Sequence, residues 1–255
     1  MACLIIKEEN MAYPKFDNKH LEEALFSASD RYKEHKLKGK LPKKIIFIYL
    51  GSLLNYIKRK YKPKKISVNK IISIYQYKDI GFVMMGGIGS PHAAIVIEEL
   101  VSLGCNVFLN VGTAGGLHKT GVFVCSKALR DEGTSYHYDK HGEYSYPDNE
   151  LKEKVKSFFN KKGLEFQEGA SWTTDAIYRE TKKEVEKYSK MGICTVEMES
   201  SALFSVAKYR KVKLASVFIV RDVLGKKWDD RKWKNVESLA RYVLDLSTKF
   251  LLEMK

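Results

Sequence analysis

The segment NVFLNVGTAGGL (residues 106–117) passes directly from an apolar run into a glycine-rich one. Residues 106–111 have the length and the continuous apolar character of a buried strand. We expect residues 112–117 to form the loop that follows this strand, because clustered glycines mark turns. A buried strand that ends in such a loop is typical of α/β proteins.

The same order occurs upstream of this segment. The strand-like GFVMM (81–85) precedes the loop GGIGSP (86–91), and a helix is expected from about His92 to Leu103. Continuous apolar strands that alternate with helices predict a parallel or mixed sheet covered on both faces. Further strands are predicted at 43–50, 65–70, 71–80 and 214–220, short strands with turns at 121–150, and helices at 53–60, 149–163, 182–191, 197–208 and 233–255.

The chain divides into two unequal parts. Residues 1–40 are polar and charged with weak helical signals, so we expect an N-terminal arm with one short helix. Residues 41–255 contain no internal repeat and no linker rich in proline, glycine and serine, so we expect them to form a single domain.

The charge balance is strongly basic. The 255 residues include 45 Lys and Arg against 31 Asp and Glu, a net charge of +14, and 44% of them are hydrophobic. This apolar fraction suffices for a core and excludes general disorder. The charge permits anionic partners, but no helix-turn-helix, RNP or KH pattern accompanies it, so nucleic acid is not the expected partner.

The four cysteines, Cys3, Cys105, Cys125 and Cys194, are widely separated. They form no Cys/His cluster, so no metal site is expected, and the last three are interpreted as buried free thiols. The apolar run at 45–57 is too short to span a membrane, and the first ten residues do not resemble a signal peptide. These features favour a cytoplasmic protein with no membrane partner.

Two glycine-rich loops, 86–90 and 112–116, are candidate anion sites, because glycine lets backbone N–H groups approach a ligand. Neither loop is a dinucleotide-binding motif or a Walker A motif. Tight turns explain each loop equally well when it is taken alone. Two such loops at successive strand ends favour a ligand site at the carboxyl edge of the sheet.

Three acids and one aromatic ring are further candidates for a site. Glu197 and Glu199 begin a predicted helix, where they either complement the helix dipole or, for Glu199, accept hydrogen bonds from a polyhydroxylated ligand such as a ribose. Asp222 comes just after a predicted strand and is either an N-cap or a catalytic acid. Trp172 lies among short polar residues and is either a core residue or a ring that stacks on a base.

Taken in order, these segments resemble the hexameric nucleoside phosphorylase superfamily, which includes purine nucleoside phosphorylase, uridine phosphorylase and the methylthioadenosine nucleosidases. The resemblance implies a three-layer α/β/α sandwich around a twisted mixed sheet, of the phosphorylase/hydrolase-like type, assembled as a homodimer or a homohexamer. It covers roughly residues 40–250 and rests on residues 82–93, NVGTAGGL (110–117), RDEGTSYHY (130–138), GASWTTDAIY (169–178), TVEMESSALFSVA (195–207) and the strand before Asp222.

The resemblance also implies roles for residues at the sugar and the base. Glu199 is expected to bind the ribose hydroxyls, with Met198 packed under the sugar. His20, from the arm of a neighbouring subunit, is expected to cap the 5′-hydroxyl of the ribose. Ala114 and Gly115 are expected to line the base site.

Stacking, proton transfer and phosphate binding complete the implied site. Trp172 is expected to stack on the base, and Asp222 to give a proton to purine N7 as the base leaves. Inorganic phosphate is the implied co-substrate, and no cofactor is implied. The implied phosphate-binding residues are Gly51, Gly87, Asn110 and Thr113.

The chain departs from the phosphorolytic pattern at two positions. Asn55 and Asn110 stand where such members carry phosphate-binding arginines, which removes two charge-assisted contacts. Asn110 is similar to the hydrolytic nucleosidases, but the glutamate with which those enzymes activate water is also absent. The alternative cations are Arg130, Arg179, Arg221, Arg231 and a lysine of a neighbouring subunit.

The expected base is a purine. Thr181 and Lys183 stand where uridine-specific members carry Gln and Arg, and those members lack an acid at the position of Asp222. Residues 130–138, however, are similar to the uridine branch. The sequence therefore predicts a purine-preferring nucleoside phosphorylase; the alternatives are a uridine phosphorylase, a phosphate-independent nucleosidase and a non-catalytic nucleoside-binding protein.

Overall fold

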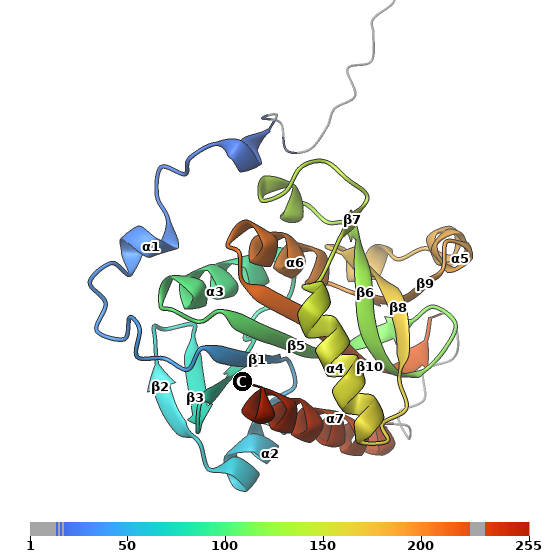
Figure 1. Cartoon of the computed structure of the whole chain (residues 1–255). Coiled ribbons are helices and arrows are strands. Elements are labelled where there is room, and N and C mark those ends of the chain that lie inside the picture. Colours follow the sequence, from blue (N-terminus) through green and yellow to red (C-terminus); the bar gives the residue numbers. More distant parts are fainter. Residues whose placement is uncertain (1–13, 15, 17, 225–232, 255) are drawn as a thin grey trace, which may run out of the picture.

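The computed structural model describes residues 14, 16, 18–224 and 233–254 of the chain. Its strands form one mixed sheet with helices on both faces (Figure 1). The strands are β1 (Lys44–Ile48), β2 (Lys64–Ser67), β3 (Ser73–Tyr77), β4 (Ile80–Met84), β5 (Val107–Gly116), β6 (Gly121–Asp131), β7 (Tyr144–Ser145), β8 (Gln167–Thr174), β9 (Ile193–Glu197) and β10 (Lys213–Val223). The helices are α1 (Ala28–Arg31), α2 (Gly51–Tyr61), α3 (Ser90–Ser102), α4 (Asn149–Lys161), α5 (Lys182–Lys190), α6 (Ser200–Tyr209) and α7 (Trp233–Glu253), with 3-10 turns η1 (Lys19–Leu21), η2 (Ser135–His137) and η3 (Ile177–Arg179).

The centre of the sheet is parallel and its flanks are mixed. The strand order is β10-β6-β8-β9-β5-β1-β4-β3-β2, and β10 also pairs with β5. β5 therefore lies between β1 and β10 and is parallel to both, with Val111 opposite Ile48 and Asn110 opposite Ser216. Strands in this position are buried on both faces, which explains their continuous apolar sequences.

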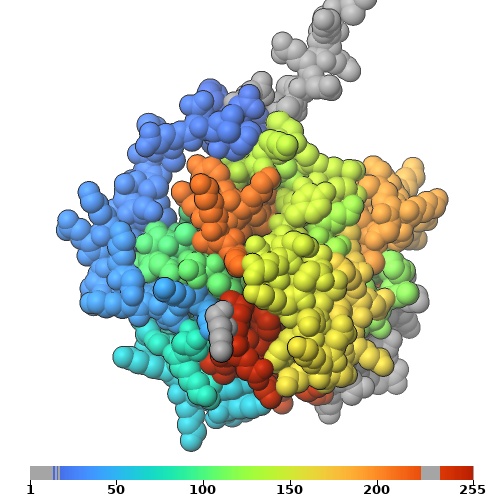
Figure 2. All heavy atoms as spheres, viewed as in Figure 1, coloured from blue at the N-terminus to red at the C-terminus, as the bar shows by residue number. Residues whose placement is uncertain are grey.

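Helices cover both faces of the sheet and form three layers. In β1, Ile45 and Phe47 join the apolar cluster under α3 and α6, whereas Ile46 and Ile48 join the cluster under α2, α4 and α7. This alternation is the two-residue period of a strand buried on both sides. On the second face, α4 and α7 pack side by side across the surface seen in Figure 2.

The arm before β1 is anchored to α3 through one buried carboxylate. Glu99 of α3 accepts hydrogen bonds from the hydroxyl of Tyr32 at 2.7 Å and from the guanidinium of Arg31 at 3.1 Å. Asn69 donates a third hydrogen bond to the same carboxylate at 2.5 Å. Tyr32 itself is 3% exposed, so this segment is packed onto the outside of the domain (Figure 1).

Some boundaries differ from those predicted. The glycine-rich residues 112–116 are not a loop but the second half of β5, because Gly115 and Gly116 pair with β9. Residues 121–131 form one long strand, β6, rather than several short ones. Glu197 ends β9, a strand that was not predicted, and α6 begins only at Ser200 with Glu199 as its N-cap.

The sequence also predicts three buried free thiols and no membrane-spanning segment. Cys105 and Cys125 are buried free thiols, and burial raises the pKa of Cys105 to about 12. Cys194 in β9 is only half-buried, so the expectation of a buried thiol is wrong there, and Cys3 lies outside the described residues. Within the described ranges, no helix is both long and apolar enough to cross a membrane.

Candidate active site

A cavity of about 360 Å³ opens at the carboxyl ends of β1, β5 and β10. Parallel strands end at the same edge of a sheet, and ligands of α/β proteins bind at such edges. The junction between β9 and α6 supplies one wall, and η3 with the residue after it supplies another. The described residues that line the cavity are Tyr49, Ile88, Asn110, Gly112, Thr113, Ala114, Gly115, Ile177, Glu180, Val196, Glu197, Met198, Glu199, Phe218, Arg221, Asp222 and Leu224.

Two buried carboxylates form the wall at the start of α6. Oε2 of Glu197 accepts hydrogen bonds from the backbone N–H groups of Glu199 (2.9 Å) and Ser200 (2.7 Å), and Oε1 accepts one from the hydroxyl of Thr173 (2.5 Å). Glu197 therefore satisfies N–H groups that the helix leaves open at its N-terminus. Oε1 of Glu199 accepts a hydrogen bond from the N–H of Gly89 at 2.7 Å, which joins the loop before α3 to this wall.

The pKa values of both carboxyls are raised in this wall. Burial raises the pKa of Glu199 to about 7, and repulsion by the charge of Glu197 is the second cause. Burial also raises the pKa of Glu197, against the effect of the hydrogen bonds that it accepts. Neighbouring carboxyls with raised pKa values in a cavity are a physical marker of a functional site.

A charged pair lines the cavity from the end of β10. Nε of Arg221 donates to Oδ1 of Asp222 at 3.4 Å, and the two side chains are 12% and 36% exposed. Asp222 lies within β10 rather than after it, so the strand backbone fixes its position. Arg221 is the one cationic side chain among the described residues of the lining.

Tyr49 and Asn110 bring two buried polar atoms to the same cavity. The hydroxyl of Tyr49 and Oδ1 of Asn110 have no hydrogen-bond partner among the described residues. Nδ2 of Asn110 donates to the hydroxyl of Ser216 at 3.1 Å, which holds the amide in place. A buried polar group without a partner costs about 1–3 kcal/mol, so we expect a ligand or water to satisfy these two atoms.

The glycine at position 112 makes room for the Tyr49 ring. A β-carbon at Gly112 would lie 3.3 Å from Cδ2 of Tyr49, closer than most real contacts of this kind. The strand backbone and the aromatic ring therefore pack directly against each other at this end of the cavity. A glycine in the middle of a strand often marks such a close approach.

The comparison with known families agrees with this architecture. The sequence model of the phosphorylase superfamily matches residues 49–253. The chain belongs to the phosphorylase superfamily. The matched range begins at Tyr49 and includes every lining residue of the cavity.

Curated members of the phosphorylase superfamily match about half of the chain. A guanosine phosphorylase of Halorubrum lacusprofundi is 28% identical over 138 residues, which are 52% of this chain and 57% of that protein. A purine nucleoside phosphorylase of Plasmodium vivax is 29% identical over 156 residues, 58% of this chain and 63% of that protein. A uridine phosphorylase of Treponema pallidum is 30% identical over 153 residues, 54% of this chain and 59% of that protein. The chain thus spans less than two thirds of the length of these relatives.

Solved structures confirm the predicted fold class. A uridine phosphorylase from Vibrio fischeri superposes with a TM-score of 0.75 at 22% identity, covering 85% of this chain and 93% of that chain. An AMP nucleosidase from Bacteroides thetaiotaomicron superposes with a TM-score of 0.73 at 19% identity, covering 89% and 97%. At this identity the likeness concerns the fold alone.

The cavity brings together most of the residues that the sequence singled out for a superfamily site. The largest group comes from β5, which supplies four of them. The predicted residues that line the cavity are Asn110, Thr113, Ala114, Gly115, Met198, Glu199 and Asp222.

Trp172 does not line the cavity. It is 1% exposed within β8, its Nε1 donates to Asp131 at 2.8 Å, and its ring packs against Tyr188 with centroids 4.9 Å apart. The short polar residues around it are themselves buried, so they belong to a strand and not to a polar loop. Of the two interpretations of Trp172, the structure shows the core residue.

Three other predicted residues also lie away from the cavity lining. Gly51 is exposed at the start of α2, and the N–H of Gly87 donates to Nε2 of His92 at 3.1 Å. The half-buried His20 lies in η1, which packs against η2 and not against the cavity of its own chain. Its expected role in a neighbouring subunit stays a prediction.

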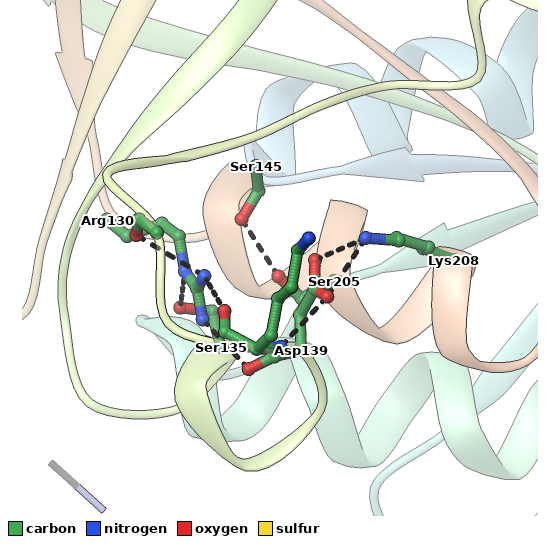
Figure 3. A network of polar contacts seen from close by, with 8 residues as sticks. Arg130, Ser135, Asp139, Ser145, Ser205 and Lys208 are labelled. Carbon is green, nitrogen blue, oxygen red and sulfur yellow. Dashed lines mark hydrogen bonds and ion pairs between the residues drawn. The ribbon is translucent and has the colours of Figure 1, made fainter. Parts of the chain in front are cut away.

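The arginines considered as alternative phosphate-binding cations differ in whether they line the cavity. Arg130 is 5% exposed, and it donates to the hydroxyl of Ser135 (2.9 Å) and to the carbonyl of Lys140 (2.7 Å) in a network away from the cavity (Figure 3). Arg179 does not line the cavity, and Arg231 lies outside the described residues. Arg221 is therefore the candidate from this set that the structure brings to the site.

Sequence reasoning missed several lining residues. Tyr49 directly follows the buried strand β1, so the sequence could have indicated that it lies at the carboxyl edge of the sheet. Phe218 looked like ordinary core, and its exposure to a cavity depends on how the end of β10 is arranged. Ile177 and Glu180 lie in an irregular segment, where neither helical nor strand periodicity indicates which way a side chain points.

Proposed function

We propose that this chain cleaves the N-glycosidic bond of purine ribonucleosides with inorganic phosphate, giving the free base and ribose 1-phosphate. The observation that carries the proposal is that Glu199 and Asp222, which come from different elements, line one cavity together with Ala114 and Gly115. The superfamily match is consistent with this reaction.

The reaction requires charge stabilisation at both ends of the breaking bond. A phosphate oxygen attacks C1′, the bond from C1′ to N9 breaks, and its electron pair passes to the base. Positive charge develops on the sugar and negative charge on the base. The proposed roles are Glu199 at the ribose hydroxyls, Met198 under the sugar, and Asp222 as the donor of a proton to N7.

Phosphate requires a cation, and Arg221 is the proposed source. In this proposal Thr113 and Asn110 contribute neutral hydrogen bonds, and Arg221 contributes charge at the same cavity. A second copy of the chain is proposed to supply His20 at the ribose end, in a homodimer or a homohexamer. A cytoplasmic location would fit this substrate and the absence of paired cysteines in the described part.

The proposed preference for purines has two supports. Asp222 is proposed to protonate N7, a group that a pyrimidine lacks, and it lines the cavity. Two of the curated relatives named above are described as guanosine and purine nucleoside phosphorylases, although a third is a uridine phosphorylase.

Hydrolysis is the second candidate reaction, and the Tyr49 and Asn110 pair favours it. The Tyr49 hydroxyl can donate and Oδ1 of Asn110 can accept a hydrogen bond, and both residues line the cavity with these atoms unpartnered among the described residues. Both groups are neutral, so neither supplies the positive charge that would favour a phosphate anion over water. Water would then attack C1′ in place of phosphate, and free ribose would be formed.

A product assay separates the two reactions. The protein is incubated with inosine, adenosine, guanosine and uridine, with and without phosphate, and the free base, ribose and ribose 1-phosphate are separated. Base release that requires phosphate and yields ribose 1-phosphate supports the proposal. Phosphate-independent release of base and ribose supports hydrolysis instead, and release of uracil alone contradicts the purine preference. A chain that binds nucleosides but releases no base contradicts catalysis.

A further inference from the structure

The positive charge of the chain is concentrated in one stretch of sequence, residues 35–78, which we call the basic segment. It contains 13 lysines and arginines and no aspartate or glutamate. The whole chain has a net charge of +14, so the residues outside the basic segment are together close to neutral. Charge of one sign that is gathered in one place creates a local field that attracts a partner of the opposite sign.

Most cations of the basic segment have no acidic partner. Lys44 is paired with Asp79 at 2.9 Å, and Lys60 is paired with Asp245. The other cations of the segment are exposed, and none of them forms an ion pair in the part of the chain that the structure describes. These unpaired cations are Lys36, Lys38, Lys40, Lys43, Lys58, Arg59, Lys62, Lys64, Lys65, Lys70 and Lys78.

The lysines of α4 and α5 differ, because acids lie beside them. Lys154 of α4 pairs with Glu150 one turn away on the same helix. α5 carries the exposed Glu186 among its own lysines. Unpaired charge is therefore a property of the basic segment and is not shared by every lysine-rich surface of this fold.

The sheet register places part of the basic segment at the edge away from the cavity. Lys64 in β2 pairs with Gln76 in β3, and Gln76 pairs with Gly81 in β4. Gly81 pairs with Ile45 near the start of β1, whereas the cavity lies at the other end of that strand. Lys78 lies in the turn between β3 and β4, at the same edge as Lys64.

The arm and the end of α2 bring further cations to this side of the molecule. The N–H of Gly39 donates to the carbonyl of Leu103, which places residues 38–40 beside the chain that leads into β5. Nζ of Lys58 lies 5.2 Å from the centre of the Tyr75 ring, so the last turns of α2 pack against β3. Figure 2 shows the arm, α2 and the β2–β3 hairpin, coloured blue to cyan, along one side of the surface.

The side chains of the basic segment suit phosphates better than bases. All but one of its cations are lysines, which bind phosphate as point charges and lack the fork with which arginine recognises guanine. Its aromatic rings are not free to stack on bases: Tyr75 is 9% exposed, and the hydroxyls of Tyr56 and Tyr61 both donate to Asp245. Contacts of this kind position a nucleic acid without reading its sequence.

We infer that the basic segment binds the phosphate backbone of a nucleic-acid duplex, independently of base sequence. This inference goes beyond the proposed function, because the surface lies away from the cavity. The sequence lacks helix-turn-helix, RNP and KH patterns, which is why nucleic acid was not the expected partner. Those modules read bases, whereas backbone binding depends on the number of phosphates that lysines neutralise.

An anionic membrane is the other large surface with matching charge. Stable adsorption to a membrane also requires apolar side chains that insert between the lipids. Ile71 is the one large apolar side chain of the basic segment that is exposed. A single isoleucine adds little apolar area, so the exposed side chains favour a nucleic acid over a membrane.

The test measures binding of a fluorescent RNA duplex of about 20 base pairs by anisotropy, in NaCl from about 50 to about 200 mM. A second duplex of unrelated sequence and vesicles with phosphatidylserine are measured in parallel. The test variant carries Lys58→Gln, Lys64→Gln and Lys65→Gln. The matched control removes the same charge from exposed positions of α5 with Lys182→Gln, Lys187→Gln and Lys190→Gln. Thermal unfolding of the three proteins checks that each is folded.

Wild type is expected to bind both duplexes equally, with an affinity that falls at least about 100-fold over this salt range. Each phosphate contact contributes about −0.9 to the slope of log affinity against log salt. The slope of the test variant is therefore less steep by about 3, and its affinity at about 100 mM NaCl is about 10-fold lower or less. The α5 control keeps the slope of wild type and loses less than about threefold in affinity.

Several results overturn the inference. Absence of duplex binding at about 50 mM NaCl does so directly. Equal losses in the two variants show that net charge acts without a defined surface, and a strong preference for one duplex shows that bases are read. Tighter binding to the vesicles than to the duplexes assigns the surface to a membrane. None of these results depends on nucleoside cleavage, which the product assay tests separately.

Discussion

The carboxylate of Glu197 accepts a hydrogen bond from the backbone N–H of Glu199 at 2.9 Å, so two acids of one cavity are coupled through the main chain as well as through their charges. Glu197 holds the first turn of α6, and Glu199 is the N-cap of that helix. The position and the ionisation of Glu199 therefore both depend on its neighbour.

The proposed ribose contact predicts a rise of activity with pH. Glu199 accepts hydrogen bonds from hydroxyls as an ionised group, and burial raises its pKa to about 7. We expect kcat/KM for base release to rise with pH and to reach half of its maximum near this value. In Glu197→Gln, the loss of the adjacent charge moves the midpoint to lower pH. A profile from about pH 5.5 to about pH 9 in both proteins checks this, and identical midpoints would contradict the coupling.

The raised pKa of Glu199 also predicts that the folded protein becomes less stable as pH rises, although activity increases over the same range. The folded pKa of about 7 exceeds the ordinary value of 4.5, so the folded state favours the protonated form. Its contribution to stability is complete below about pH 4.5 and is lost as pH rises through about 7, up to roughly 3 kcal/mol in all. We expect Glu199→Gln to melt above wild type at about pH 8 and to lose this advantage at about pH 5. Thermal unfolding with Glu186→Gln as the control tests it, and an advantage that grows on acidification would refute it.

Asp222 is expected to matter for chemistry more than for binding. A side chain that gives a proton to a leaving base contributes about 10²- to 10⁴-fold to the rate. We expect Asp222→Asn to lower kcat for guanosine by at least about 100-fold while nucleoside binding, measured by calorimetry, changes little. Loss of affinity with unchanged kcat would show that Asp222 is a binding group instead.

Gly116 is expected to be essential for the fold of the β5 edge. A β-carbon there would collide with the backbone carbonyl of Lys119 and approach Val220 Cγ1 at 2.8 Å. Since a backbone atom cannot move aside cheaply, Gly116→Ala is expected to cost about 1–3 kcal/mol. Gly86→Ala, where a β-carbon meets nothing within 4 Å, is the matched control. Urea unfolding compares the two, and equal midpoints would be inconsistent with the packing described.

The arm is expected to loosen when one hydroxyl is removed. The Tyr32 hydroxyl donates to Glu99 at 2.7 Å and accepts from Asn69 at 2.8 Å. Tyr32→Phe leaves a buried carboxylate with one donor fewer, at a cost of about 1–3 kcal/mol. We expect faster tryptic cleavage within residues 33–40 than in wild type. Tyr146→Phe, at an exposed tyrosine, is the control and should leave the cleavage rate unchanged.

The fold class was predictable because its signals are local and strong. Ile45 to Ile48 are apolar on both faces, and Leu151, Val155 and Phe159 repeat every fourth residue on α4. The boundary at 112–116 was not predictable. Glycine usually ends a strand, but here it allows β5 to continue alongside β9, a pairing with a segment distant in the sequence.

The candidate site was predictable where residues follow regular strands. Asn110, Thr113 and Asp222 could be assigned to one sheet edge because parallel strands end together. Trp172 was ambiguous because its partner Asp131 comes from another strand, and only the pairing of β8 with β6 brings the two together. Glu180 lies in an irregular segment, so its direction depends on packing alone.

The position of β5 has a consequence for the synthesis of the chain. β5 has β1 on one side and β10 on the other, and four strands separate β5 from β10 in the sequence. A growing polypeptide therefore lacks the β10 partner of its central strand from the completion of β5 at Gly116 until β10 is made, starting at Lys213. An unpaired strand edge is a template for adhesion to other chains. Nascent chains that stall before Lys213 expose this edge, so premature termination is expected to yield aggregating fragments and not a smaller folded domain.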